Sequence, residues 1–237
     1  MNRLMIIIVV LLVIVCLFGC GGQPGPALTS TGPTTPPATT QTPTAANWQF
    51  DTTAAVPGKV PISFAGSISQ SGSKVSGVLH VGGSDCFDPA ATIVLTGTVT
   101  AGSTSLMSTA IDGQVVTFTG SFIGNAFSGT YRIDGGCAAG EQGRVTGRNI
   151  PYIANQQSGT FTSYARTTFS VAGDIAQSAS PSPDGSFEVS GSATFDTSCF
   201  RTGTIRPGTF SSGSFILGRT VVLEMDTSNG PSPLLGP

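Results

Sequence analysis

The chain has 237 residues, with ten Lys and Arg, twelve Asp and Glu and a single histidine, for a formal net charge of −2 at pH 7. Charged residues make up 9% of the chain, against about a quarter in an ordinary soluble protein. The basic residues form no cluster. This excludes a nucleic-acid partner, because such proteins present a basic patch or stripe to the phosphate backbone.

The N-terminus has the layout of a secretory signal. Arg3 supplies one positive charge, residues 4–18 are uncharged and apolar, and small residues begin at Gly19. A membrane-spanning helix needs about 20 apolar residues, and this run is shorter. We therefore expect residues 1–19 to be a signal helix that is removed during export.

The segment ends in Leu17-Phe18-Gly19-Cys20. These four residues resemble the lipobox of bacterial lipoproteins, in which the Cys receives a diacylglyceryl group and becomes the first residue after cleavage. The resemblance implies that acyl chains such as palmitate on Cys20 hold the protein in the membrane of the cell envelope. Gly21 stands where many inner-membrane lipoproteins carry Asp, so the resemblance further implies the outer membrane.

Residues 20–46 are predicted to be a disordered linker behind the lipidated Cys20. From Gly21 to Ala46 there are six prolines, eight threonines and no charges. Such a segment buries too little apolar surface to offset the entropy lost on ordering. We interpret it as a stalk that holds a folded body away from the lipid.

Beyond Trp48 the sequence alternates apolar or small residues with Ser and Thr, a period of two that indicates strands with one buried face. Seven apolar rows each contain one glycine, over residues 62–68, 75–81, 93–99, 116–122, 127–133, 169–175 and 187–193. Glycine within a strand occurs where a sheet bends or two backbones approach closely. The fold class is therefore predicted as all-β, a small antiparallel barrel, with a β-sandwich as the alternative.

The body contains two related copies. Similar short segments recur in the same order, such as Gly97-Thr98-Val99 and Gly203-Thr204-Ile205. We predict a complete copy at 48–150, with strands starting near residues 48, 61, 73, 92, 103, 114, 126 and 141, and a shortened β-rich copy at 155–229. Eight strands suffice to close a barrel. Residues 230–237, which contain three prolines, are predicted to be a disordered tail.

Three cysteines remain after Cys20, an odd number for an exported protein. Cys86 and Cys137 lie in the complete copy, whereas Cys199 is the counterpart of Cys86 with no later cysteine. We therefore predict a Cys86–Cys137 disulfide. The competing pair, Cys86 with Cys199, would instead join the two copies.

Residues that could carry chemistry are scarce. By strand parity His80 is expected on the outer, solvent-facing side. Asp85 and Asp88 flank Cys86 and Phe87 in a loop, but a calcium ion needs six to eight ligands, so no metal and no cofactor is predicted. Phe87 and Phe200 occupy equivalent positions beside a cysteine in the two copies. Each is expected either to pack against the cysteine sulfur or, together with Asp85 and Asp88, to contact a ligand.

The whole chain is similar to uncharacterised bacterial lipoproteins that carry a Thr/Pro stalk and Ser/Thr/Gly-rich β repeats. We expect a membrane-anchored, non-catalytic envelope module that binds a small ligand, a glycan or another envelope protein. A structural spacer is one alternative. The other is a hydrolase using carboxylates such as Asp112, Asp134 or Glu141, which the scarcity of titratable groups disfavours.

Overall fold

The protein is described from a computed structural model. The structure describes residues 45–55, 61–162, 168–195, 202–227 and 230–236. The signal segment, Cys20, most of the Thr/Pro stalk, Cys199 and Phe200 lie outside these ranges. Within them, no helix has the length and apolar character needed to cross a bilayer.

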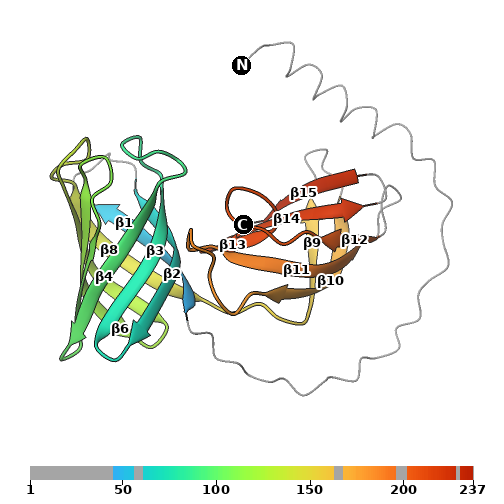
Figure 1. Cartoon of the computed structure of the whole chain (residues 1–237), viewed down its shortest axis with the longest axis horizontal. Coiled ribbons are helices and arrows are strands. Elements are labelled where there is room, and N and C mark those ends of the chain that lie inside the picture. The colour runs from blue at the N-terminus through green and yellow to red at the C-terminus, as the bar shows by residue number, and fades with distance from the viewer. Residues whose placement is uncertain (1–44, 56–60, 163–167, 196–201, 228–229, 237) are drawn as a thin grey trace, which may run out of the picture.

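Eight antiparallel strands form a closed barrel, in which β8 pairs with β1 (Figure 1). Their bounds are β1 Ala46–Ala54, β2 Ser63–Ser71, β3 Lys74–Gly82, β4 Thr92–Thr100, β5 Ser103–Ser108, β6 Val115–Ile123, β7 Ala126–Asp134 and β8 Gln142–Ile150. Every predicted strand start lies within two residues of an observed one. The all-β class and the barrel are confirmed.

The inward-facing side chains fill the barrel. Phe50, Phe64, Phe118, Ile93 and Leu95 are fully buried. The Phe118 ring centroid lies 5.7 Å from that of Phe50 and 5.1 Å from that of Phe64. An eight-stranded barrel is just wide enough for side chains to fill, and here the buried apolar side chains form one packed core cluster.

The inward glycines lie where neighbouring backbones come too close for a side chain. A Cβ atom on Gly97 would be 1.9 Å from the carbonyl oxygen of Ser105, and one on Gly120 would be 2.2 Å from that of Ser128. Gly66, Gly77, Gly129 and Gly143 meet backbone oxygens at similar distances. These close approaches let the sheet coil tightly enough to close.

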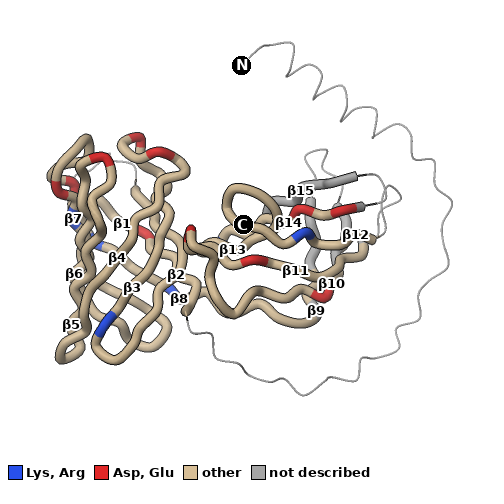
Figure 2. The backbone as a smooth tube through the Cα atoms, in the orientation of Figure 1, with Lys and Arg blue, Asp and Glu red and all other residues tan. Residues whose placement is uncertain are grey.

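The two ends of the barrel carry different connections. At one end, two-residue turns join β2 to β3, β4 to β5 and β6 to β7. At the other end the loops are longer and carry Cys86, Cys137 and most of the barrel's acidic residues, as Figure 2 shows. We call this second end the disulfide end.

The second copy forms a smaller antiparallel sheet beside the barrel (Figure 1). Its strands are β9 Gln156–Thr162, β10 Thr168–Gln177, β11 Phe187–Phe195, β12 Thr202–Ile205, β13 Phe215–Leu217, β14 Thr220–Thr227 and β15 Gly230–Gly236. Within the described residues, β9 pairs only with β10 and β15 only with β14. The sheet is therefore open within these residues.

One strand position of this sheet is interrupted. β12 and β13 lie end to end, because both pair with β11 on one side and β14 on the other. The chain leaves the sheet between them as the 206–214 loop (Arg206–Ser214). Ser214 closes its base: the Ser214 amide donates to the carbonyl of Arg206, and its hydroxyl bonds the backbone of Glu224. The complete copy has a full hairpin, β4–β5, at the corresponding place.

The C-terminal residues differ from the sequence prediction. Residues 230–236 pair with β14 as strand β15, although a disordered tail was expected over 230–237. The expectation rested on the prolines, which cannot donate to a ladder of hydrogen bonds. An edge strand tolerates proline because one side of it needs no partner, and β15 is such a strand.

Candidate functional site

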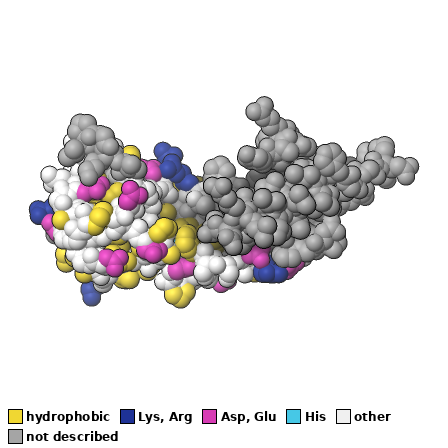
Figure 3. Space-filling view, turned by 90° about the horizontal axis from the view of Figure 1, so that it is seen from above, with side chains coloured by type: hydrophobic (Ala, Val, Ile, Leu, Met, Phe, Trp, Pro, Cys, Tyr) yellow, Lys and Arg dark blue, Asp and Glu magenta, His cyan; other side chains and the backbone are white. Residues whose placement is uncertain are grey.

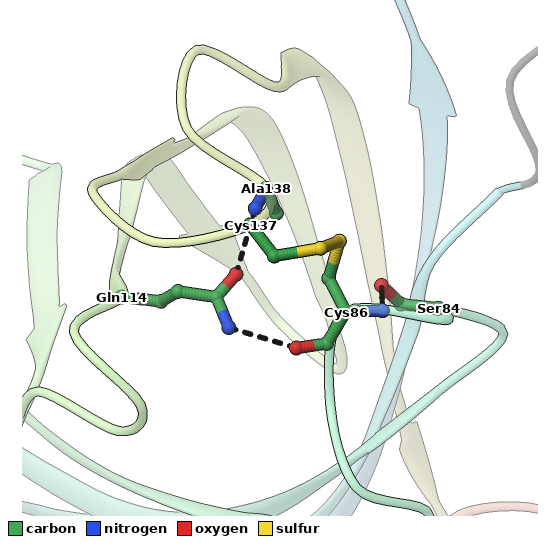
Figure 4. Close-up of a disulfide and its surroundings, with 5 residues drawn as sticks. All are labelled: Ser84, Cys86, Gln114, Cys137 and Ala138. Carbon is green, nitrogen blue, oxygen red and sulfur yellow. Dashed lines mark hydrogen bonds between the residues drawn. A yellow bond between two sulfur atoms is a disulfide. The ribbon is translucent and has the colours of Figure 1, made fainter.

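The disulfide end is held together by a covalent bond and a buried amide. Cys86 and Cys137 form the predicted disulfide, with 5.4 Å between their Cα atoms. Between their loops, the buried Gln114 side chain donates to the Cys86 carbonyl at 2.9 Å and accepts from the Ala138 amide at 3.0 Å (Figure 4). The loops are thus fixed to one another across this end.

The residues predicted to contact a ligand do not converge at this end. Phe87 is 5% exposed and belongs to the barrel core, so packing accounts for it. Asp85 and Asp88 are exposed, and a carboxylate oxygen of Asp88 accepts from the Ala90 amide within its own loop. Phe200 lies outside the described residues. Seen from this end, acidic side chains are scattered among uncharged ones and form no single patch (Figure 3).

Two of the three carboxylates of the hydrolase alternative have local structural partners. Asp134 forms an ion pair with Arg132 at 2.5 Å, and Glu141 accepts from the Tyr131 hydroxyl at 3.0 Å. Burial raises the pKa of that phenol, which therefore stays a hydrogen-bond donor. Asp112 occupies a turn with φ of 50°. In the described part of the chain no cluster of His, Cys, Asp and Glu could hold a metal.

The outer wall of the barrel at β1–β3 is buried, because the smaller sheet packs against it. Asn47, Gln49, Ser67 and His80 point outward by strand parity, yet all are buried. The expectation of a solvent-facing His80 is wrong: it is 6% exposed. Strand parity correctly predicted that His80 faces outward, but it did not predict that the smaller sheet covers this face.

Hydrogen bonds between side chain and backbone hold the two parts together. The Asn47 side chain donates to the Gly218 carbonyl at 2.9 Å and accepts from the Gly218 amide at 2.8 Å. The adjacent Arg219 forms an ion pair with Asp51 at 2.9 Å. Because both of these charged side chains are about half exposed, the ion pair adds little stability. The buried contact between Asn47 and Gly218 therefore fixes how the smaller sheet is aligned on the barrel.

Two turns of the smaller sheet press their backbones onto this wall. Gly218, between β13 and β14, has φ of 56°, and a Cβ there would lie 2.2 Å from the Gln49 side-chain oxygen. Gly185, before β11, has φ of 85°, and a Cβ would lie 2.3 Å from the Val78 carbonyl oxygen. Both positions need glycine for conformation and for space, which indicates a specific contact.

The 206–214 loop reaches the barrel at His80. The ring of Phe210 lies 4.1 Å from the His80 ring, centroid to centroid. Asp184 fixes this loop, since it accepts from the Phe210 amide at 3.1 Å and from the amide and hydroxyl of Ser186. Burial alone would raise the pKa of Asp184, but these hydrogen bonds outweigh it and hold that pKa below its usual value. Asp184 is therefore a carboxylate at neutral pH.

His80 itself is held in an unusual environment. Both ring nitrogens are buried, and neither has a hydrogen-bond partner among the described residues. Burial lowers the pKa of His80, and the charge and backbone of Asp184 act in the opposite direction without cancelling the effect. The docked histidine is accordingly neutral at pH 7.

Beside this contact the two parts line an open hollow of about 630 Å³, which we call the junction hollow. Its walls come from both parts and combine apolar, aromatic and planar polar side chains. They include Gln49, Asp51, His80, Pro89, Phe210 and Arg219. A second hollow of 660 Å³ lies on the far wall of the barrel over Thr117, Thr130 and Arg144, but it has no exposed aromatic wall.

Comparison of the chain with protein-family models, with curated proteins and with solved structures finds no match. The functional argument therefore rests on the residues themselves. Sequence reasoning missed the junction hollow because its residues are scattered over both copies. Gly218 was the nearest signal, because Gly218-Arg219-Thr220-Val221 is similar to Gly113-Gln114-Val115-Val116, but nothing in that repeat indicates what the turn contacts.

Proposed function

We propose that the protein is a lipid-anchored, exported module that acts by binding and not by catalysis, with the junction hollow as its binding site. The observation that carries this proposal is the hollow itself. Its size is in the range of small-molecule sites, and such sites favour the boundary between two structural units and combine apolar walls with a few polar groups.

The chemistry of the walls fits a saccharide. A sugar ring presents an apolar C–H face and a rim of hydroxyl groups. Phe210 and Pro89 offer apolar surface to that face, while the half-exposed Asp51 and Arg219 offer an acceptor and donors to the hydroxyls. Gln49 is already tied to Asp51 at 3.2 Å, which orients both side chains toward the same space.

The binding proposal is tested by titration with two oligosaccharides, one neutral and one carboxylated, namely chitotetraose and tetragalacturonic acid. We expect at least one to bind with a Kd on the order of 1 mM or tighter, equivalent to about −4 kcal/mol, measured by calorimetry on the full chain. Phe210→Ala should weaken binding at least about tenfold through the lost ring contact. Ile123→Ala, which alters an exposed side chain at the opposite end of the barrel, serves as the control.

A structural spacer is the second candidate, favoured by the filled barrel and by the glycine-mediated contact between the two parts. If neither tetramer binds the wild-type protein, the binding proposal is contradicted and the spacer becomes the better account. We rank the hydrolase third, because Arg132 and Tyr131 engage two of its three carboxylates.

The anchoring part of the proposal rests on Leu17 to Cys20, outside the described residues. Cys20→Ser should move the protein from the membrane fraction into the soluble or uncleaved pool, because the acyl chains then have no thiol to join. Fractionation of cells, followed by immunoblotting, measures this. A variant that is fully cleaved and still sediments with membranes would contradict lipid anchoring at Cys20, the feature from which the proposed cell-envelope, outer-membrane location is inferred.

A further inference from the structure

The contact between the barrel and the smaller sheet contains one group that changes charge near neutral pH. His80, the only histidine in the chain, is buried under the Phe210 ring with both nitrogens unpartnered. In an undocked molecule its outward-facing ring would be hydrated. Docking therefore removes water from the ring, and the backbone of Asp184, which acts in the opposite direction, does not offset that loss.

The charged groups around His80 do not offset this loss. Asp184 is the one acid that acts on the ring, and its oxygens already accept from Ser186 and Phe210. On the flanking strands, Ala65 and Thr92 lie opposite His80 and carry no charge.

Two further groups of charges near this contact form ion pairs. Asp51 is paired with Arg219. Arg206, at the base of the 206–214 loop, is paired with Glu224 and Asp226.

We propose that protonation of His80 releases the smaller sheet from the barrel, so that mild acidification opens the junction hollow. A protonated ring under Phe210 would be a desolvated cation, whereas the same ring in the undocked molecule is stabilised by water. The inference concerns the docking of the two parts and does not depend on whether the hollow binds a saccharide.

The sign and the pH range follow from linkage. At pH values above about 6.5, the ordinary pKa of histidine, the ring is neutral in both states and docking is at its strongest. Below that value the undocked ring takes up a proton first, because the docked ring has a lowered pKa. Docking then weakens by up to about tenfold per pH unit, until the docked ring also titrates and the loss stops.

The test uses NMR on the full-length Cys20→Ser chain between pH 7.5 and 5.0. The Gly218 amide donates to Asn47 across the interface, so its protection from hydrogen exchange, corrected for intrinsic rates, reports docking. We expect this protection to fall up to about tenfold per pH unit below pH 6.5. Amides of β6 and β7, two strands of the barrel, should keep their protection from exchange over the same pH range. His80→Phe, which retains a ring against Phe210, should make the Gly218 protection independent of pH.

Two outcomes overturn the proposal: wild-type protection that stays constant to pH 5.0, and a fall of the same size in His80→Phe, which would assign the effect to another group. If the smaller sheet of His80→Phe is undocked at every pH, the proposal is decided by the NMR titration of the single His80 ring in the chain that retains it. A midpoint below 6.5 that coincides with the loss of Gly218 protection supports the proposal. A midpoint at or above 6.5, or one that does not coincide, contradicts it.

Discussion

Gly97→Val is expected to destabilise the barrel by about 3 kcal/mol or more, at the upper end of overpacking effects. A Cβ at this position would lie 1.9 Å from the Ser105 carbonyl oxygen and 2.9 Å from the Leu106 Cα. Both atoms belong to the backbone of the paired strand β5, so no side-chain rotation relieves the clash. The two strands would have to separate where the barrel coils.

Urea unfolding followed by tryptophan fluorescence measures this effect. Trp48 is the only tryptophan in the chain, and it is buried in the barrel core, so its emission reports the barrel. The matched control is Thr98→Val, which adds the same side chain one residue later on the exposed face and should change stability by less than about 0.5 kcal/mol. Equal effects at the two positions would show that the inward glycines are passive.

Removing the Cys86–Cys137 disulfide is expected to cost about 4 kcal/mol. The two cysteines are 51 residues apart, and in the chain-entropy model a bridge of that span restricts the unfolded chain by roughly this amount. A domain's total stability is on the order of 5–15 kcal/mol, so the loss is a large share. The hydrogen bonds of Gln114 to both loops favour a folded but weakened barrel.

The double variant Cys86→Ala/Cys137→Ala, compared with the wild type in the same urea assay, measures the cost. Reduced wild-type protein should match the variant, because both lack the same covalent constraint. Non-reducing peptide mapping provides the control on pairing. A linked peptide that contains Cys199 would contradict the disulfide and would mean that a covalent bond joins the two copies.

The barrel could be predicted from the sequence because its determinants are local. Alternation identified the inward residues, and the repeated glycines, such as Gly97 and Gly120, indicated where backbones approach one another. The disulfide followed from the arrangement of the cysteines in the two copies. Each of these signals lies within one strand or one repeat, where pattern and physical cause coincide.

The junction could not be predicted in the same way. Parity placed His80 on the outer wall, but polar residues on an outer wall are ordinarily exposed, and no pattern indicated that a second sheet covers this one. The 206–214 loop interrupts a strand position in the shortened copy, whereas the complete copy has the β4–β5 hairpin at the corresponding place. Phe210 therefore reaches His80 through a departure from the repeat.

The most direct test of binding at the junction hollow is to map the tetramer titrations onto the structure by NMR. Binding in the hollow predicts that saccharide addition shifts the signals of Phe210, Arg219 and the His80 ring, while the loops of the disulfide end, around Asp85 and Asp88, stay unchanged. Shifts confined to the disulfide end would contradict the junction hollow as the binding site and favour the loops there. An unchanged spectrum with both tetramers would contradict saccharide binding altogether.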